Sequence, residues 1–156
     1  MIQPLTKNDR STAAARRPTR SGFSLVELSV VVIIIGVLAA FGVPRLLRSV
    51  EKSKASEAFK YLTSVRDAQE RDSMRNGEYA GSIEDLDFRQ ATPKYFSLLP
   101  IVPGDTGSLQ DSWSMTLRRQ GASAGYGAYE ITFTQEGYDA ATSTIEALPD
   151  IHPMAR

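Results

Sequence analysis

The chain has 156 residues, with 18 basic and 18 acidic side chains and no cysteine. This length fits one small domain plus a segment outside its core, and the lack of cysteine excludes disulfides and thiol chemistry. The neutral total hides an uneven distribution, because residues 1–22 are strongly basic and the rest of the chain is acidic in balance.

Residues 1–22 form a polar segment rich in Arg, Ser, Thr and Pro. Its charged side chains are the basic Lys7, Arg10, Arg16, Arg17 and Arg20 and the acidic Asp9. A basic tail can bind nucleic acid, but neither aromatic interleaving nor a binding fold accompanies this one, so we expect no nucleic-acid partner. Basic residues before an apolar span remain in the cytoplasm, which predicts that the N-terminus is cytoplasmic and the C-terminal part is exported.

An apolar stretch follows from Phe23 to Val43 and is interrupted only by Ser24, Glu27 and Ser29. As a helix its 21 residues would be about 31 Å long, which matches the hydrocarbon thickness of a bilayer. A carboxylate inside such a span costs free energy unless it is neutralised or paired. Glu27 therefore marks a candidate functional site.

Cleavage between Gly22 and Phe23 would create a cationic partner for this carboxylate. The new α-amino group would have a pKa of about 8, and Glu27 lies about 6 Å further along the helix. Parallel helices shifted by one such step would bring Glu27 of one molecule to the N-terminus of the next. Because this arrangement repeats without limit, it predicts a filament.

Two other interpretations of the first 43 residues stay open. A basic region, an apolar core and the small residues Ala40 and Gly42 also suit signal peptidase, although the apolar block is longer than the usual core and Glu27 lies early in it. The other interpretation is a plain uncleaved membrane anchor.

The segment GFSLVELSVVVIIIGVLAAFGVP, residues 22–44, strongly resembles the processing signal of type IV pilins and type II secretion pseudopilins. The resemblance implies that prepilin peptidase cuts between Gly22 and Phe23 and methylates Phe23, that Glu27 governs assembly, and that Pro44 marks a kink or melted region of the helix. It also implies partners, namely membrane lipid, an inner-membrane assembly platform, and identical or other pilin-like subunits. Many pilins close a C-terminal loop with a disulfide, and the lack of cysteine favours a pseudopilin-like or divergent branch.

Beyond Pro44 the pattern becomes that of an amphipathic helix. Apolar residues recur at three- and four-residue spacing at Ala55, Ala58, Phe59, Leu62, Val65 and Ala68. The pair Asn76-Gly77 is a helix stop signal. We therefore expect one helix from Phe23 to about Asn76, kinked at Pro44; a membrane span and a separate soluble helix divided by Pro44 are the alternative.

The remainder of the chain predicts a small antiparallel sheet. Residues 82–85 favour a capped turn, and residues 91–110 are rich in Pro, Gly and Ser and predict a loop. Alternating apolar residues at 113–118 and 129–134 predict a hairpin across 121–125. Gly137 predicts a further turn, and residues 142–148 a third strand.

A sheet with one apolar face needs a covering layer, which the amphipathic helix supplies. The predicted fold is therefore α+β, with a long N-terminal helix packed on a small antiparallel sheet. The chain order after the helix is also similar to the pilin pattern, in Asn76-Gly77-Glu78-Tyr79, Leu86, Leu99-Pro100 and Asp111-Ser112-Trp113. Major pseudopilins have Gly after this Trp, where this chain has Ser114.

No catalytic site, cofactor or metal is expected. The single histidine, His152, is expected to be solvated near a frayed C-terminus, and neither a phosphate loop nor a paired-histidine motif occurs. A calcium site would need oxygen ligands, and the candidates are Asp105, Asp111, Glu136 and Asp139, but they do not form a dense Asp/Asn/Gly loop.

Two further sets of side chains have ordinary structural explanations. Tyr126, Tyr129, Phe133 and Tyr138 are expected to form the core and rim of the sheet. Lys52, Lys54 and Lys60 are expected to be solvated, although in a filament they could pair with Glu51, Glu57 or Asp67 of neighbouring subunits.

The sequence thus predicts a structural filament subunit with three parts: a cleaved cytoplasmic leader (1–22), a transmembrane and assembly helix (23–50) and an exported globular domain (51–156). It would lie in the bacterial inner membrane as a single-pass protein and then in a periplasmic or cell-surface filament. A membrane-anchored exported binding or adhesion domain is the alternative function. The sequence does not distinguish a pilus from a secretion pseudopilus or an uptake fibre.

Overall fold

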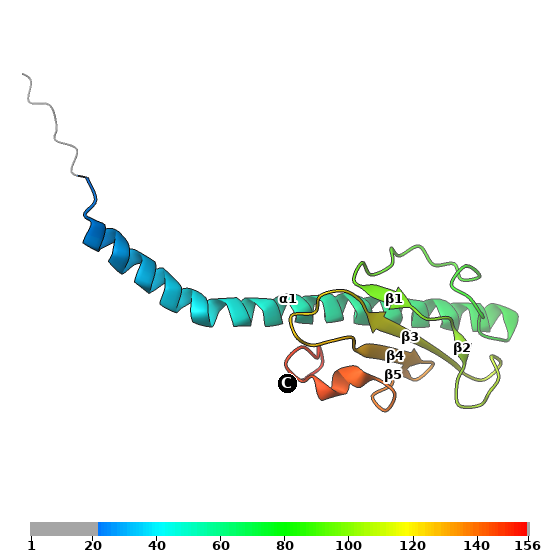
Figure 1. Cartoon of the computed structure of the whole chain (residues 1–156). Coiled ribbons are helices and arrows are strands. Elements are labelled where there is room, and N and C mark those ends of the chain that lie inside the picture. Colours follow the sequence, from blue (N-terminus) through cyan, green and yellow to red (C-terminus); the bar gives the residue numbers. More distant parts are fainter. Residues whose placement is uncertain (1–21, 156) are drawn as a thin grey trace, which may run out of the picture. The chain divides into compact units, whose positions relative to one another are not determined.

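The computed structural model describes residues 22–155; most of the predicted leader lies outside this range, as does Arg156. The helices and strands are α1 (Leu25–Asn76), β1 (Phe96–Leu98), β2 (Val102–Pro103), β3 (Trp113–Arg119), β4 (Glu130–Thr134), β5 (Gly137–Tyr138) and the 3-10 helix η1 (Thr144–Ala147). One long helix and a small antiparallel sheet confirm the predicted α+β class (Figure 1). The chain divides into two compact units between Leu38 and Ala39, and each is described by itself.

Helix α1 passes through Pro44 without interruption and ends where the sequence predicts. At its start, the Ser24 hydroxyl accepts a hydrogen bond of 3.3 Å from the backbone N–H of Val26, which satisfies one of the free N–H groups of the first turn. At its end, Gly77 has a φ of 79°, a left-handed conformation that glycine adopts without steric cost. The predicted helix is thus continuous across Pro44 and is not divided there into two helices. A kink at Pro44 stays a prediction.

Strand β3 is the central strand of the sheet. It pairs antiparallel with β1, β2 and β4, and β5 extends the sheet beyond β4. The register places Leu117 opposite Ile131 and Met115 opposite Phe133, so these four side chains lie on one face. All four are buried. The predicted hairpin and its apolar alternation are therefore confirmed.

The apolar face of α1 covers this face of the sheet, and Figure 1 shows β3 and β4 alongside the C-terminal half of the helix. Every residue of the predicted apolar stripe of the helix is buried, from Ala55 to Ala68. Phe59 lies near the centre of the contact, with its ring centroid 5.7 Å from that of Phe133 and 4.9 Å from that of Tyr138. The aromatic residues of the sheet therefore serve as core and rim, as predicted, with Tyr129 buried and Tyr126 partly buried.

The predicted turn at 82–85 is present, because the Ser82 hydroxyl bonds to the Asp85 carboxylate at 3.0 Å and the chain turns back at Leu86. Two other predictions for the C-terminal part were wrong. Residues 91–110 are not all loop, since they contain β1 and β2. These strands are too short to show an alternating pattern, and pairing with β3 determines them.

The third predicted strand, residues 142–148, is wrong as well, because η1 occupies this segment. A third strand would pair with the backbone N–H groups of β4. Two of these N–H groups instead donate hydrogen bonds to side chains. The Ser143 hydroxyl accepts the N–H of Thr132 at 2.9 Å, and the Thr144 hydroxyl accepts the N–H of Glu130 at 2.8 Å. With these groups satisfied, the backbone of the segment is free to turn, and Ile145 enters the core.

Candidate functional site

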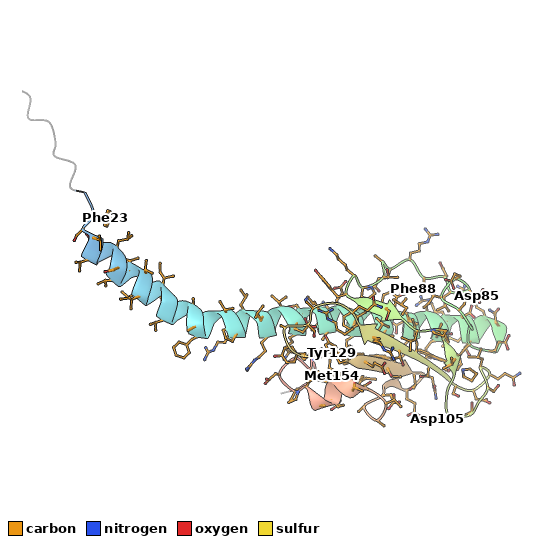
Figure 2. The ribbon with its side chains drawn as sticks, viewed as in Figure 1. Phe23, Asp85, Phe88, Asp105, Tyr129 and Met154 are labelled. Carbon is orange, nitrogen blue, oxygen red and sulfur yellow. The ribbon has the colours of Figure 1, made fainter. Side chains whose placement is uncertain are left out.

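Gly22 and Phe23, the predicted processing site, lie in the extended residues before α1. The Phe23 side chain is 82% exposed, and Figure 2 shows it at the start of the helix. A Cβ atom added at Gly22 would meet no other atom within 4 Å. Packing within the described residues therefore does not require glycine here, so the reason for this small residue lies outside the fold.

Glu27, the predicted assembly residue, is the acidic residue of the first turn of α1 and is exposed. A carboxylate at this end of a helix is favourable, because the free N–H groups carry a partial positive charge. Among residues 22–155, Glu27 takes part in none of the ion pairs. The carboxylate thus faces outward, where a group from another molecule could approach it.

The N-terminal part of α1, before and after Glu27, exposes apolar side chains on all sides (Figure 2). These include Leu25, Val26, Leu28, Val30, Val31, Val32, Ile33, Ile34, Ile35, Val37, Leu38, Phe41 and Val43. By length and composition α1 is long and apolar enough to cross a membrane, and it is the one described helix that meets this condition. So large an apolar surface needs lipid or other apolar helices around it.

Pro44, the second predicted assembly residue, lies inside α1. It has no N–H, so the helix lacks one hydrogen bond to the turn before it. No atom lies within 4 Å of a Cβ added at Gly36 or Gly42, and each glycine lowers helix stability by about 1 kcal/mol relative to alanine. Helix propensity therefore predicts the lowest helix stability between Gly36 and Pro44, and this stays a prediction.

A buried ionic cluster joins α1 to the sheet just after this segment. The Glu51 carboxylate accepts hydrogen bonds from Arg119 Nε at 2.6 Å, Tyr129 Oη at 3.0 Å and Lys54 Nζ at 3.1 Å. Glu51 and Arg119 are both almost fully buried. A buried charge is tolerated when it is paired and hydrogen-bonded in this way.

Arg119 also binds the chain around it. Its guanidinium donates to the backbone carbonyls of Tyr95, Gln120 and Ala122. Burial alone would raise the pKa of Glu51, but the hydrogen bonds from Arg119, Lys54 and Tyr129 outweigh burial and hold the pKa below its usual value. The cluster therefore stays ionised and connects α1 with β3 and the segments on either side of it.

Sequence reasoning missed this cluster, although two signals for it were present. Glu51 lies four residues before Ala55, in line with the apolar stripe of the helix. Arg119 continues the inward alternation of Trp113, Met115 and Leu117. An acidic and a basic residue at inward positions of two packed elements predict a buried pair.

The cluster corrects two predictions about the helix charges. Glu51 is not available to a neighbouring subunit, because it is 1% exposed and bound to Arg119. Lys54 is not simply solvated, because its ammonium group bonds to Glu51 and lies 4.5 Å from the ring centroid of Tyr95. Glu57, Lys60 and Asp67 are exposed, and pairing of these residues between subunits stays a prediction.

The prediction of a solvated His152 was wrong. The side chain is 6% exposed, and its ring centroid lies 5.5 Å from that of Phe59. Its Nε2 lies 3.1 Å from Tyr138 Oη, and its Nδ1 accepts the N–H of Met154 at 3.1 Å. The buried neighbour Ile151 holds this segment against the core, so nearness to the C-terminus did not mean fraying.

Among residues 22–155 no group of three or more His, Asp or Glu side chains could hold a metal ion. Asp139, one of the carboxylates considered for calcium, bonds to the Thr142 hydroxyl at 2.7 Å and to the N–H of Ala141 at 2.9 Å. These bonds, led by that from Thr142, lower the pKa of Asp139.

The N-terminal segment matches the family model of the prokaryotic N-terminal methylation motif over residues 17–43. This range contains Gly22, Phe23 and Glu27. The chain therefore carries a prokaryotic N-terminal methylation motif around the predicted processing site.

The similarity to known proteins extends over more residues than the motif covers. The chain is 35% identical over 71 residues to the type IV major pilin protein PilA of Myxococcus xanthus, covering 46% of this chain and 32% of that protein. It is 32% identical over 68 residues to the type II secretion system core protein G of Aeromonas hydrophila, covering 44% and 48%. With core protein G of Vibrio cholerae the identity is 28% over 129 residues, covering 69% and 86%. No solved structure matches the chain significantly.

The chain thus spans about a third and about a half of the first two of these relatives. In its motif, and in its long apolar helix followed by a small antiparallel sheet, the chain is similar to type IV pilins and type II secretion pseudopilins, and these relatives support that similarity.

Proposed function

We propose that this protein is a structural subunit of a type IV pilus-like or type II secretion pseudopilus filament. The observation that carries the proposal is a helix that exposes apolar side chains on every side from Leu25 to Val43, with one carboxylate, Glu27, in its first turn. Such a surface is stable in lipid and equally in a bundle of like helices. The same helix can therefore serve first as a membrane anchor and then as the core of a filament.

Processing between Gly22 and Phe23 is the second part of the proposal. The fold gives no packing reason for glycine at position 22, whereas a peptidase that must approach the backbone closely does. Cleavage would leave a cationic amine on Phe23, which a prepilin peptidase and methyltransferase would then methylate. The leader would face the cytoplasm, because it is basic, and the domain after α1 would face the other side.

Glu27 would act during assembly. In the membrane its charge is costly, and a neighbour's N-terminal amine would compensate that cost. The compensation is available only when two subunits lie side by side with a suitable axial shift, so the pair favours addition of subunits in register. An inner-membrane assembly platform would supply the work of moving each subunit out of the lipid.

The breadth of the match favours a secretion pseudopilus. The similarity to core protein G of Vibrio cholerae covers 86% of that protein and 69% of this chain, whereas the match to PilA covers 32% of PilA and 46% of this chain. The relatives are structural subunits rather than enzymes, and we propose no reaction for this chain.

Substitution of Glu27 tests the assembly role. Glu27→Gln should leave cleavage intact and strongly lower the amount of filament that shearing releases from cells, because the N-terminal amine then lacks its partner. Glu78→Gln is the matched control, since Glu78 is an exposed glutamate just after the end of α1 and outside the apolar segment. Normal filament yield from Glu27→Gln would remove Glu27 from the mechanism. Absence of any filament from the wild type, with the chain still in the membrane, would favour an anchored binding or adhesion domain.

A further inference from the structure

The two turns of α1 that follow the apolar segment have a basic side and an apolar side, and every residue of both sides is exposed except Lys52, which is partly exposed. Arg45, Arg48 and Lys52 fall within about 60° of each other around the helix at 100° per residue. The opposite side carries Leu46, Leu47 and Val50, whose exposed fractions are 63%, 47% and 43%. Glu51 lies on neither side, because it is turned into the core. We call Arg45, Arg48 and Lys52 the basic stripe.

The basic stripe carries little compensating negative charge. Among the described residues the one acidic side chain that pairs with it is Asp150, whose Oδ2 lies 3.7 Å from Arg48 Nε. Both side chains of that pair are about half exposed, and such pairs contribute at most about 1 kcal/mol. The stripe therefore presents a net positive surface to any anion that approaches the helix.

The position of the basic stripe along the helix indicates which kind of anion it would meet. Val43 ends the apolar block, and at 1.5 Å per residue Arg45 lies about 3 Å and Arg48 about 7.5 Å beyond it. The headgroup region is about 5–8 Å thick on each side of the hydrocarbon. Lys52 lies further out, but helical side chains tilt toward the N-terminus of their helix, which here is the direction of the membrane. All three cations can therefore reach the level of the lipid phosphates.

We propose that the basic stripe binds the headgroups of anionic phospholipids while the subunit is held in the membrane. This inference rests on the membrane-anchored precursor of the proposed function and adds a lipid preference to it. Leu46, Leu47 and Val50 extend the apolar surface into the same layer, so the stripe and the apolar side together match an interface between hydrocarbon and anionic headgroups. The stripe would hold α1 at a fixed depth until the subunit leaves the lipid.

Lipid retention by the full chain in detergent micelles, measured by native mass spectrometry, tests this proposal. Wild type titrated with phosphatidylglycerol and with phosphatidylcholine should retain the anionic lipid preferentially. Each basic side chain near an anionic surface contributes a factor of about five, so Arg45→Gln/Arg48→Gln/Lys52→Gln should bind phosphatidylglycerol about a hundredfold more weakly. Phosphatidylcholine binding should not change.

The matched control is Lys60→Gln/Arg71→Gln/Arg75→Gln, which removes the same charge from exposed positions further along α1. It should keep the lipid preference, as should Arg45→Lys/Arg48→Lys, which keeps the charge. Equal retention of both lipids by the wild type, or an equal loss in both triple variants, would overturn the inference. The proposed function is tested separately in the cells that produce the protein: if the wild type sediments with their membranes and is cleaved, a missing lipid preference defeats this inference alone.

Discussion

Arg119 and Glu51 are 68 residues apart in the sequence, yet Arg119 Nε lies 2.6 Å from Glu51 Oε1 and both side chains are buried. This contact joins the C-terminal end of β3 to the second turn of α1 after the apolar segment. Removing two charges from water costs several kcal/mol per ion, and the added bonds from Tyr129 and Lys54 offset part of this cost. We infer that the pair determines which turn of α1 faces the sheet.

Breaking the pair should strongly destabilise the fold. Glu51→Gln leaves the buried Arg119 without its counter-charge, and we expect a loss of about 3–5 kcal/mol in the free energy of unfolding. Denaturant titration of the detergent-solubilised full chain, followed by near-ultraviolet circular dichroism, measures the effect. Glu51→Leu/Arg119→Met should recover most of the loss, because an apolar pair has no unpaired charge. Glu57→Gln, on the exposed side of the same helix, should change stability by less than about 0.5 kcal/mol.

The pair should also make stability depend on pH in the acid range. The pKa of Glu51 is lowered in the folded state from its ordinary value of 4.5 by the hydrogen bonds described above, so the unfolded chain binds a proton first as pH falls. Its contribution to stability is complete above that value and is lost as pH falls below it toward the lowered pKa. Melting temperatures measured from pH 7 to pH 3 should therefore fall more steeply for the wild type than for Glu51→Gln. Parallel curves would show that Glu51 does not carry this dependence.

Two buried tyrosines should respond differently to loss of their hydroxyl groups. Tyr129 Oη donates to Glu51 at 3.0 Å, whereas the buried hydroxyl of Tyr61 has no hydrogen-bond partner among the described residues. Tyr129→Phe should lower the free energy of unfolding by about 1.5–3 kcal/mol, because it removes a hydrogen bond to a charged group. Tyr61→Phe should be neutral or stabilising. The reverse order of the two melting temperatures would contradict the contacts described for the cluster.

Phe59 should be the apolar side chain on which the packing of helix and sheet depends most. It contacts Phe133, Tyr138 and His152 at once, so Phe59→Ala should leave a cavity and cost about 3–5 kcal/mol. Met74→Ala removes a side chain of similar size that is 82% exposed on the same helix. Denaturant titration of the two variants should show a large loss for the first and almost none for the second.

Periodicity along the chain explains how much of this fold the sequence predicted. The stripe from Ala55 to Ala68 and the alternation at Trp113, Met115 and Leu117 each repeat often enough to determine a buried face. The end of α1 at Asn76 was predictable because Gly77 favours the left-handed conformation. These signals are local, so a single sequence is enough to show them.

The errors concern features that only distant contacts determine. His152 is buried because Phe59, 93 positions earlier, offers an aromatic surface, and η1 replaces a strand because the hydroxyl groups of Ser143 and Thr144 satisfy the backbone of β4. The candidate processing and assembly residues are a different case. Gly22 and Glu27 were predicted from a motif. The reason for these residue types lies in contacts with other molecules, so the fold of a single chain shows where they lie but not why they are glycine and glutamate.

The most direct test of a cleaved, filament-forming subunit is mass spectrometry of the protein in filaments sheared from cells, compared with the protein that stays in the membrane. Our account predicts that the filament fraction contains a chain beginning with N-methylated Phe23. It also predicts that Gly22→Val leaves an uncut precursor in the membrane and no subunit in that fraction. A mature chain that begins at Val43, or an intact chain with Met1 as the only form in cells, would contradict it.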